Sequence, residues 1–231
     1  MSKDLALIVD SIRVDRMGLP VVKNVSLRAP RKEITVLLGA NGAGRTTLLE
    51  AIAGSLDIAE GKALLGGTEL KGTSPVFRNR QGLGHVEQGR TIFSELSVDE
   101  NLLVCCPRSE IQVAFDWFPE LRKRRNTLAS MLSGGEQQML VIARALLCNP
   151  RILMIDEMSL GLAPIIVNRL LDTLKELVAD GLGVLLVEQF AHLALPYGQT
   201  AYVMSGGQIV LKEDSASLIN ASERLHDAYL S

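Results

Sequence analysis

Aromatic residues are scarce in this sequence and make up 4% of its 231 residues. Aliphatic side chains must therefore supply most of the packing. With 47% hydrophobic residues, the chain can bury one substantial core and a smaller attached subdomain. A basic excess is lacking as well, because 24 Lys and Arg stand against 26 Asp and Glu. Proteins that bind a nucleic-acid duplex usually present a basic face, so no nucleic-acid partner is expected.

Long apolar runs and metal-binding cysteine pairs are also missing. No uninterrupted apolar run reaches the roughly 18–20 residues that cross a bilayer. Residues 1–10 carry acidic side chains within a short apolar stretch, unlike a signal peptide. Cys105, Cys106 and Cys148 lack the CxxC spacing and the nearby histidine of a zinc site, which favours reduced thiols. We therefore expect a soluble chain that can dock on a membrane protein.

Three short apolar runs predict strands that are buried on both faces, as in a parallel sheet covered by helices. They span residues 34–38, 152–155 and 184–187. Polar residues follow each run at once: a glycine-rich segment, the pair Asp156-Glu157 and the pair Glu188-Gln189. Because ligands bind at the carboxyl ends of strands in open α/β sheets, these three clusters are expected to form one site.

The remaining segments predict helices, a hairpin and a helical insertion. Residues 165–178 have helical spacing after Pro164, and the tail over 215–230 is also expected to be helical. Gly206-Gly207 lies between two apolar runs and predicts a β-hairpin. Helix formers dominate residues 91–149, which predicts a helical subdomain inserted in a core formed by about 1–90 and 150–231. Its basic run, residues 122–125, is interpreted as a solvated helix end rather than a binding patch.

A glycine-rich segment with the sequence GANGAGRTT follows the first predicted strand and precedes an apolar stretch over 48–53. It fits the phosphate-loop pattern G-x-x-x-x-G-K-[ST], except that arginine replaces the lysine. Backbone N–H groups and the helix N-terminus are expected to bind nucleotide phosphates, and the hydroxyl of Thr46 to bind Mg²⁺. The residues of this loop are Gly39, Ala40, Asn41, Gly42, Ala43, Gly44, Arg45, Thr46 and Thr47.

Two adjacent carboxylates end the second predicted strand. Burying them there would cost free energy unless a cation or polarised water met them. We expect Asp156 to bind Mg²⁺ through water and Glu157 to polarise the water that attacks a γ-phosphate. On its own this pair is weak evidence, but a phosphate loop upstream strengthens it.

The segment LSGGEQQ over residues 132–138 decides the family. Its serine can cap the following helix, and its glycines allow the backbone to approach an anion closely. Placed between a phosphate loop and Asp156-Glu157, it closely resembles the signature of ABC ATPases, and the resemblance covers nearly the whole chain. The resemblance implies an α/β P-loop NTPase core with a parallel sheet, an antiparallel β subdomain and a helical subdomain. The chain would then be one ATP-binding domain that uses ATP and Mg²⁺.

The resemblance also implies roles for further residues. Subunits of that family pair head-to-tail, so the signature residues Ser133, Gly134, Gly135 and Glu136 would act on the nucleotide of the partner subunit. Gln88 matches the glutamine that contacts Mg²⁺ and faces the membrane partner. Gln189 stands at the position of the switch histidine and would contact the γ-phosphate. Arg16 stands where an aromatic residue stacks on adenine; its guanidinium can stack on the base or lie exposed on the surface.

A closer resemblance is to the smaller ATP-binding subunit of branched-chain amino-acid importers. GANGAG, LSGGEQQML, SLGLAP at residues 159–164 and VEQ at 187–189 carry it. It implies a heterodimer with a larger homologous subunit, on transmembrane permease subunits, in the cytoplasm at the inner face of the plasma membrane. Urea and amide importers share much of the pattern. ABC ATPases of DNA repair or translation usually carry fused cassettes, zinc modules or basic arms, and none is present here.

Arg45 leaves two hypotheses open. A guanidinium is bulkier than the ammonium it replaces, which predicts weaker positioning of the phosphates and slower hydrolysis. The chain is then either a slow ATPase that drives transport or a module that binds nucleotide beside a catalytic partner.

Overall fold

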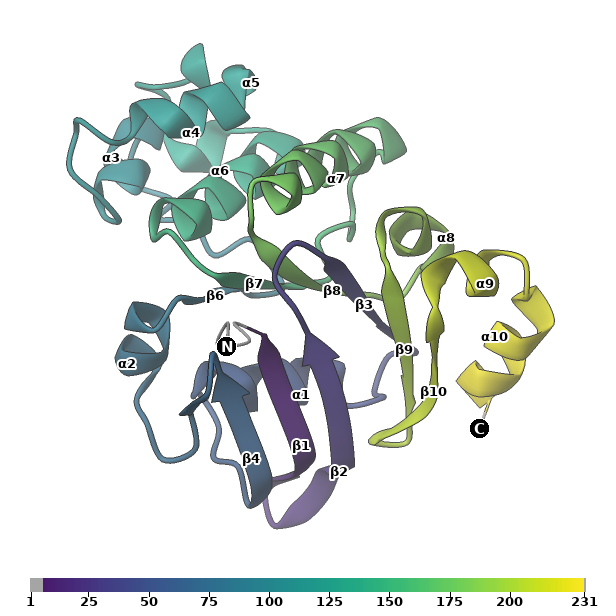
Figure 1. Ribbon diagram of the computed structural model, residues 1–231. Coiled ribbons are helices and arrows are strands. Elements are labelled where there is room, and N and C mark those ends of the chain that lie inside the picture. Colours follow the sequence, from purple (N-terminus) through teal and green to yellow (C-terminus); the bar gives the residue numbers. More distant parts are fainter. Residues whose placement is uncertain (1–5, 231) are drawn as a thin grey trace.

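The computed structural model describes residues 6–230, which form two β-sheets (Figure 1). The larger sheet has the order β10-β9-β3-β8-β7-β6, with β10 antiparallel to β9 and the others parallel. Its strands are β3 (Ile34–Gly39), β6 (Leu83–Val86), β7 (Ile152–Asp156), β8 (Gly183–Glu188), β9 (Thr200–Ser205) and β10 (Gln208–Asp214). The three predicted strands and the hairpin are therefore confirmed. Strands β3, β7 and β8 are buried throughout, as expected for the centre of a covered parallel sheet.

The smaller sheet is antiparallel and has the order β2-β1-β4-β5. Its strands are β1 (Leu7–Arg16), β2 (Leu19–Ala29), β4 (Glu60–Leu65) and β5 (Thr68–Glu69). Helix α1 (Arg45–Ala53) packs between the two sheets, because Leu48, Leu49 and Ile52 share one buried cluster with residues of both. This packing places the glycine-rich loop where the two sheets meet.

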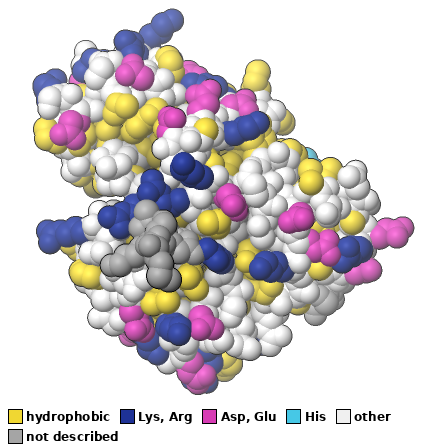
Figure 2. All heavy atoms as spheres, viewed as in Figure 1, with side chains coloured by type: hydrophobic (Ala, Val, Ile, Leu, Met, Phe, Trp, Pro, Cys, Tyr) yellow, Lys and Arg dark blue, Asp and Glu magenta, His cyan; other side chains and the backbone are white. Residues whose placement is uncertain are grey.

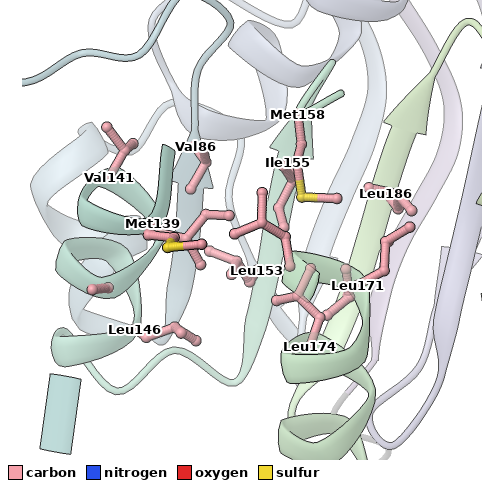
Figure 3. Close-up of a cluster of buried hydrophobic side chains, with 14 of the residues drawn as sticks. Val86, Met139, Val141, Leu146, Leu153, Ile155, Met158, Leu171, Leu174 and Leu186 are labelled. Carbon is pink, nitrogen blue, oxygen red and sulfur yellow. The ribbon is translucent and has the colours of Figure 1, made fainter. Parts of the chain in front are cut away.

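Helices cover the other face of the larger sheet. Helix α6 (Gly134–Leu147) and helix α7 (Pro164–Ala179) pack on β7 and β8 through Leu153, Ile155 and Leu186 (Figure 3). Helices α3 (Val98–Leu103), α4 (Gln112–Trp117) and α5 (Pro119–Arg122) lie with α6 at the top of Figure 1, within the segment predicted to be a helical insertion. The predicted fold class is confirmed.

The C-terminal segment differs from the single helix predicted. It forms α9 (Ser215–Ile219) and α10 (Ser222–Leu230), because α9 ends at Asn220, a residue type that favours caps over helix interiors. Two short helices, α2 (Pro75–Arg80) and α8 (Ala191–Ala194), complete the α-helical elements of the described chain. Within residues 6–230, the structure contains no helix whose length and hydropathy suit a membrane span.

Arg78 of α2 is a buried cation at the C-terminal end of α1. Its side chain donates to the carbonyls of Ala51 and Ile52 at 2.6 and 2.8 Å, and to that of Thr73 at 3.2 Å. Helix α1 has no basic residue in its own last turn, so Arg78 supplies the donors and the positive charge that its free carbonyls favour.

Replacing Arg78 by methionine is expected to lower the free energy of unfolding by about 3 kcal/mol, because buried carbonyls lose a charged donor. Denaturant unfolding followed by circular dichroism measures this. Arg80→Met is the matched control, since Arg80 lies on the same helix but is exposed. An equal loss in both variants would show that Arg78 does not hold the end of α1.

Candidate active site

The glycine-rich loop follows β3 and leads into α1. A Cβ at Gly39 would lie 2.5 Å from the carbonyl oxygen of Met204, so only glycine fits against β9 at this position. Gly44 has φ 100° and is the N-cap of α1, where it offers no side chain to the first N–H groups of the helix. Those groups remain available to an anion, and the helix dipole favours negative charge there.

A pocket of about 380 Å³ opens over this loop. Its lining brings together the ends of β3, β6, β7 and β8, so the clusters expected to meet do meet. Beyond residues 41–47, the lining residues are Val21, Gln88, Glu157, Leu160 and Gln189.

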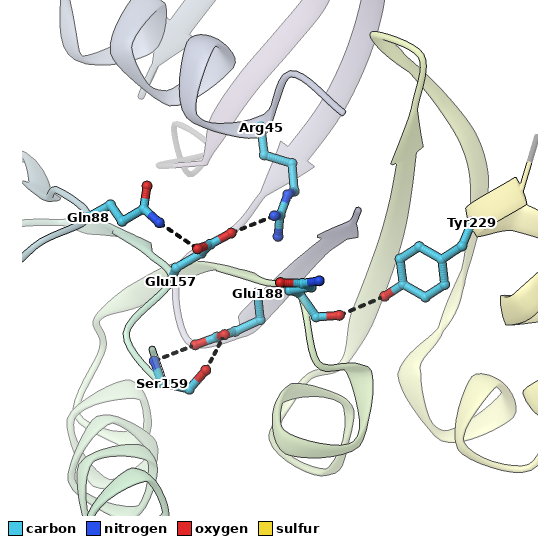
Figure 4. Close-up of polar contacts among 7 residues, drawn as sticks. Arg45, Gln88, Glu157, Ser159, Glu188 and Tyr229 are labelled. Atoms are coloured by element: carbon cyan, nitrogen blue, oxygen red, sulfur yellow. Dashed lines mark hydrogen bonds and ion pairs between the residues drawn. The ribbon is translucent and has the colours of Figure 1, made fainter. Parts of the chain in front are cut away.

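Glu157 is held between two donors in this pocket (Figure 4). Arg45 donates to its Oε1 at 2.5 Å and Gln88 to its Oε2 at 2.6 Å. The Arg45 and Glu157 side chains are 5% and 10% exposed, so the pair is screened little by water. Glu157 has φ 47°, an unfavourable backbone conformation for this residue type, and its N–H donates to the carbonyl of Val187 at 2.9 Å. The fold therefore aims this carboxylate at the arginine of the loop.

Asp156 lies beside this pair but lacks such partners. Its side chain is buried, and neither carboxylate oxygen has a hydrogen-bond partner within the described chain. Burial raises the pKa of Asp156, the Glu157 charge adds to the shift, and the Thr46 hydroxyl and the Arg45 guanidinium oppose it. A buried carboxylate without partners fits a cation, and Thr46 and Gln88 line the pocket nearby. The oxygen atoms of these three side chains are thus of the kind that Mg²⁺ binds.

Comparison with known proteins decides the family. The family model described as "ABC transporter" matches residues 22–159. The chain belongs to the ABC transporter family. Over 219 residues it is 40% identical to the high-affinity branched-chain amino acid transport ATP-binding protein BraG of Pseudomonas aeruginosa, covering 92% of this chain and 94% of that protein. It is also 31% identical to the lipopolysaccharide export system ATP-binding protein LptB of Haemophilus influenzae, over 91% of this chain and 90% of that protein.

Solved structures agree on the fold. A nucleotide-free ATP-binding cassette from an ABC transporter matches with a TM-score of 0.88 and 23% identity, covering 97% of this chain and 98% of that one. The chain is therefore an ATP-binding subunit of an ABC transporter, and its family and fold indicate ATP hydrolysis.

In this ABC subunit the signature residues lie outside the pocket. Ser133 and Glu136 form a capping box at the start of α6: Ser133 N–H donates to Glu136 Oε2 at 2.8 Å, and Glu136 N–H to Ser133 Oγ at 3.3 Å. Arg124, from the basic run, pairs with the other oxygen of Glu136 at 3.0 Å. Gly134 and Gly135 form the first turn of this helix, and none of the four signature residues lines the pocket.

Arg16, the residue expected near adenine, also lies outside the lining residues. Its guanidinium pairs with Glu50 of α1, and its side chain is 45% exposed. The structure thus ties this arginine to the loop helix on the surface of the protein.

The sequence did not predict three further contacts at the site. The buried Glu188 accepts from Ser159 N–H at 3.1 Å and from its hydroxyl at 2.6 Å, which holds the loop after β7 (Figure 4). Burial raises the pKa of Glu188, and the Ser159 hydrogen bonds oppose the shift.

Tyr229 of α10 donates to the carbonyl of Gln189 at 3.1 Å. Arg90 donates to the carbonyl of Leu160 at 2.8 Å. The polar end of β8 was the one sequence signal among them.

Proposed function

We propose that this chain is the ATP-binding subunit of an ABC importer, in which it hydrolyses Mg-ATP to drive uptake of branched-chain or related amino acids. The observation that carries the catalytic part is the buried Glu157 carboxylate, aimed into the pocket over the phosphate loop. The solute class rests on the likeness to BraG, which extends over nearly all of both chains. The likeness to LptB over a similar length makes the transport direction the part that most needs a test.

The residues of the pocket suit in-line attack of water on a γ-phosphate. Loop N–H groups at the start of α1 bind the phosphates, and Arg45 adds a positive charge. Glu157 accepts the proton of the attacking water, and Gln189 orients the γ-phosphate. Thr46, Gln88 and Asp156 would hold Mg²⁺, which would neutralise charge on the phosphate oxygens. Residues 133–136 act on the nucleotide of the partner subunit.

The Arg45–Glu157 pair favours a second candidate function. A carboxylate that already accepts from a guanidinium at 2.5 Å has that oxygen occupied, and an arginine drawn to Glu157 is not on the phosphates. Phosphate must therefore compete for Arg45 before Glu157 can act. On this view the chain binds nucleotide as a hydrolysis-impaired partner of a catalytic subunit.

The assembly we propose is a head-to-tail heterodimer with a homologous ABC subunit, bound to transmembrane permease subunits at the cytoplasmic face of the plasma membrane. Exposed side chains in the helical segment over residues 91–149 support docking on the permease subunits. They are Phe93, Val104 and Met131. Figure 2 shows hydrophobic side chains gathered over this region. Exposed apolar patches of this kind often bind another protein. A urea or amide importer remains the alternative assembly.

Arg45→Lys separates the two candidates. We expect it to raise kcat of the assembled transporter about tenfold, because the compact ammonium frees Glu157 and binds the phosphates as a point charge. Phosphate release measures the rate. Arg45→Met is the control, and should weaken ATP binding without restoring turnover. If the wild-type chain hydrolyses ATP as fast as Arg45→Lys, the binding-only function is wrong.

The solute is tested with the same assembled complex. Its ATPase rate is measured with leucine, isoleucine and valine, and separately with urea and short amides, each with its binding protein. Stimulation by a branched-chain amino acid supports the proposed solute class. Stimulation by urea alone would replace it and leave the ATPase function standing.

A further inference from the structure

Two cysteines far apart in the sequence meet in a small cavity away from the nucleotide pocket. Cys105 follows the end of α3 and Cys148 is the C-cap of α6, two helices that pack together. Both residues line a cavity of about 170 Å³, together with Arg144 and His85. Cys105 is half-buried and Cys148 is exposed, so small reagents can reach both.

Arg144 supplies a positive charge at this cavity. Its Nη1 donates to the carbonyl of Thr91 at 2.8 Å, and its guanidinium lies 4.3 Å from the centre of the Phe93 ring. Its Nε is buried and has no hydrogen-bond partner within the described chain. The guanidinium therefore retains a donor for an anion, and the two cysteines line the same cavity.

The surroundings of the three cysteines shift their pKa values in different directions. The neighbouring Cys148 thiol lowers the pKa of Cys105 to about 6, Arg144 adds to this shift, and burial opposes it. The neighbouring Cys105 and burial raise the pKa of Cys148, whose Sγ donates to the carbonyl of Arg144 at 3.7 Å. Burial also raises the pKa of Cys106, next to Glu110, and its sulfur lies 4.0 Å from the carbonyl of Leu102. These shifts favour the thiolate on Cys105, with Cys148 as the neighbouring thiol.

We propose that Cys105 and Cys148 form a peroxide-oxidisable site, in which Cys105 reacts with a small hydroperoxide and Cys148 closes the product to an intrachain disulfide. An accessible thiolate beside a second cysteine is the arrangement that such oxidation requires. A metal site is not supported, because no group of three or more His, Cys, Asp or Glu residues in the described chain could hold an ion.

The reaction balances with hydrogen peroxide as the oxidant. The Cys105 thiolate attacks one peroxide oxygen, the O–O bond breaks, and the hydroxide that leaves takes a proton and becomes water. Cys105 is then a sulfenic acid. The Cys148 sulfur attacks the Cys105 sulfur, the S–O bond breaks, and a second water leaves with the Cys148 proton. The two thiols lose two electrons and the peroxide gains them.

Oxidation has a structural consequence for the neighbouring segment. The disulfide removes the negative charge beside Arg144, and Arg144 holds Thr91 and Phe93, three and five residues after Gln88. Hydrogen exchange over residues 91–93 is therefore expected to change on oxidation. The thiol chemistry itself does not depend on the proposed transport function.

Site-resolved alkylation of the wild-type chain tests the reactivity without any variant. At pH 6.5, iodoacetamide should modify Cys105 about tenfold faster than Cys106, since the larger thiolate fraction outweighs the lower nucleophilicity. Peptide mass spectrometry measures both rates in the same sample. Equal rates, or a faster Cys106, would overturn the proposal.

The disulfide is tested by treating the reduced chain with a few equivalents of hydrogen peroxide. We expect a peptide that links Cys105 to Cys148, reversed by dithiothreitol, and the same link in the control Cys106→Ser. In Cys148→Ser, dimedone should trap a sulfenic acid at Cys105. Links only between chains, a Cys105–Cys106 link, or no loss of Cys105 thiol would each contradict the site.

Discussion

Glu157→Gln is expected to lower kcat for ATP hydrolysis by at least about 100-fold, because an amide cannot accept the proton of the attacking water. The same change is expected to tighten ATP binding. The amide loses the charge that pairs with Arg45, and its NH₂ group cannot accept from Gln88, so both side chains become free to meet the nucleotide. A gain of about 1.4 kcal/mol would appear as a tenfold lower Kd.

Two measurements are needed. Phosphate release by the assembled transporter gives kcat, and calorimetric titration of the purified chain with Mg-ATP gives Kd. Glu87→Gln is the matched control, since Glu87 is an exposed acid next to Gln88 that does not line the pocket. Unchanged turnover in Glu157→Gln would remove Glu157 from the chemistry. Weaker binding would show that the Arg45–Glu157 pair does not compete with phosphate.

The elements that sequence predicted correctly are those whose signal is local. The strands around residues 34–38, 152–155 and 184–187 are apolar throughout, and both faces of the sheet that they form are covered. The loop over 39–47 combines glycine spacing with a strand before it and a helix after it. Because ligands bind at the carboxyl ends of strands in open α/β sheets, the polar residues after these strands could be expected to share one site.

The contacts that hold the side chains of the site in place join residues that are far apart in the sequence. Arg45 and Glu157 are 112 residues apart, and nothing near either one predicts that a substituted arginine would bind the carboxylate. The cap that Arg78 provides for α1 likewise depends on how α2 packs. Strand β1 is interrupted by register shifts, and Ser11 within it has φ 53°, so its apolar alternation is broken. Such features follow from tertiary packing, which one sequence does not reveal.

Asp156→Asn is expected to stabilise the nucleotide-free chain while it abolishes turnover. The wild-type carboxylate is buried without a hydrogen-bond partner within the described residues, so its charge costs free energy that the neutral amide avoids. We expect the free energy of unfolding at pH 8 to rise by about 1 kcal/mol. Hydrolysis should fall by at least about 100-fold, because the site loses the carboxylate best suited to Mg²⁺.

The ligand effect separates this prediction from simple stabilisation. Mg-ATP at 100 times its Kd should stabilise the wild-type chain by about 2.7 kcal/mol, and EDTA should remove much of that effect. In Asp156→Asn the difference between magnesium and EDTA should disappear. Asp180→Asn, at an exposed helix end, should change neither quantity. If Asp156→Asn were less stable without nucleotide, or kept its magnesium-dependent stabilisation, the buried carboxylate would have another purpose than binding a cation. We therefore expect Asp156→Asn to be more stable and inactive. This combination arises when a binding site contains a buried charge that binds a ligand but lowers the stability of the protein without that ligand.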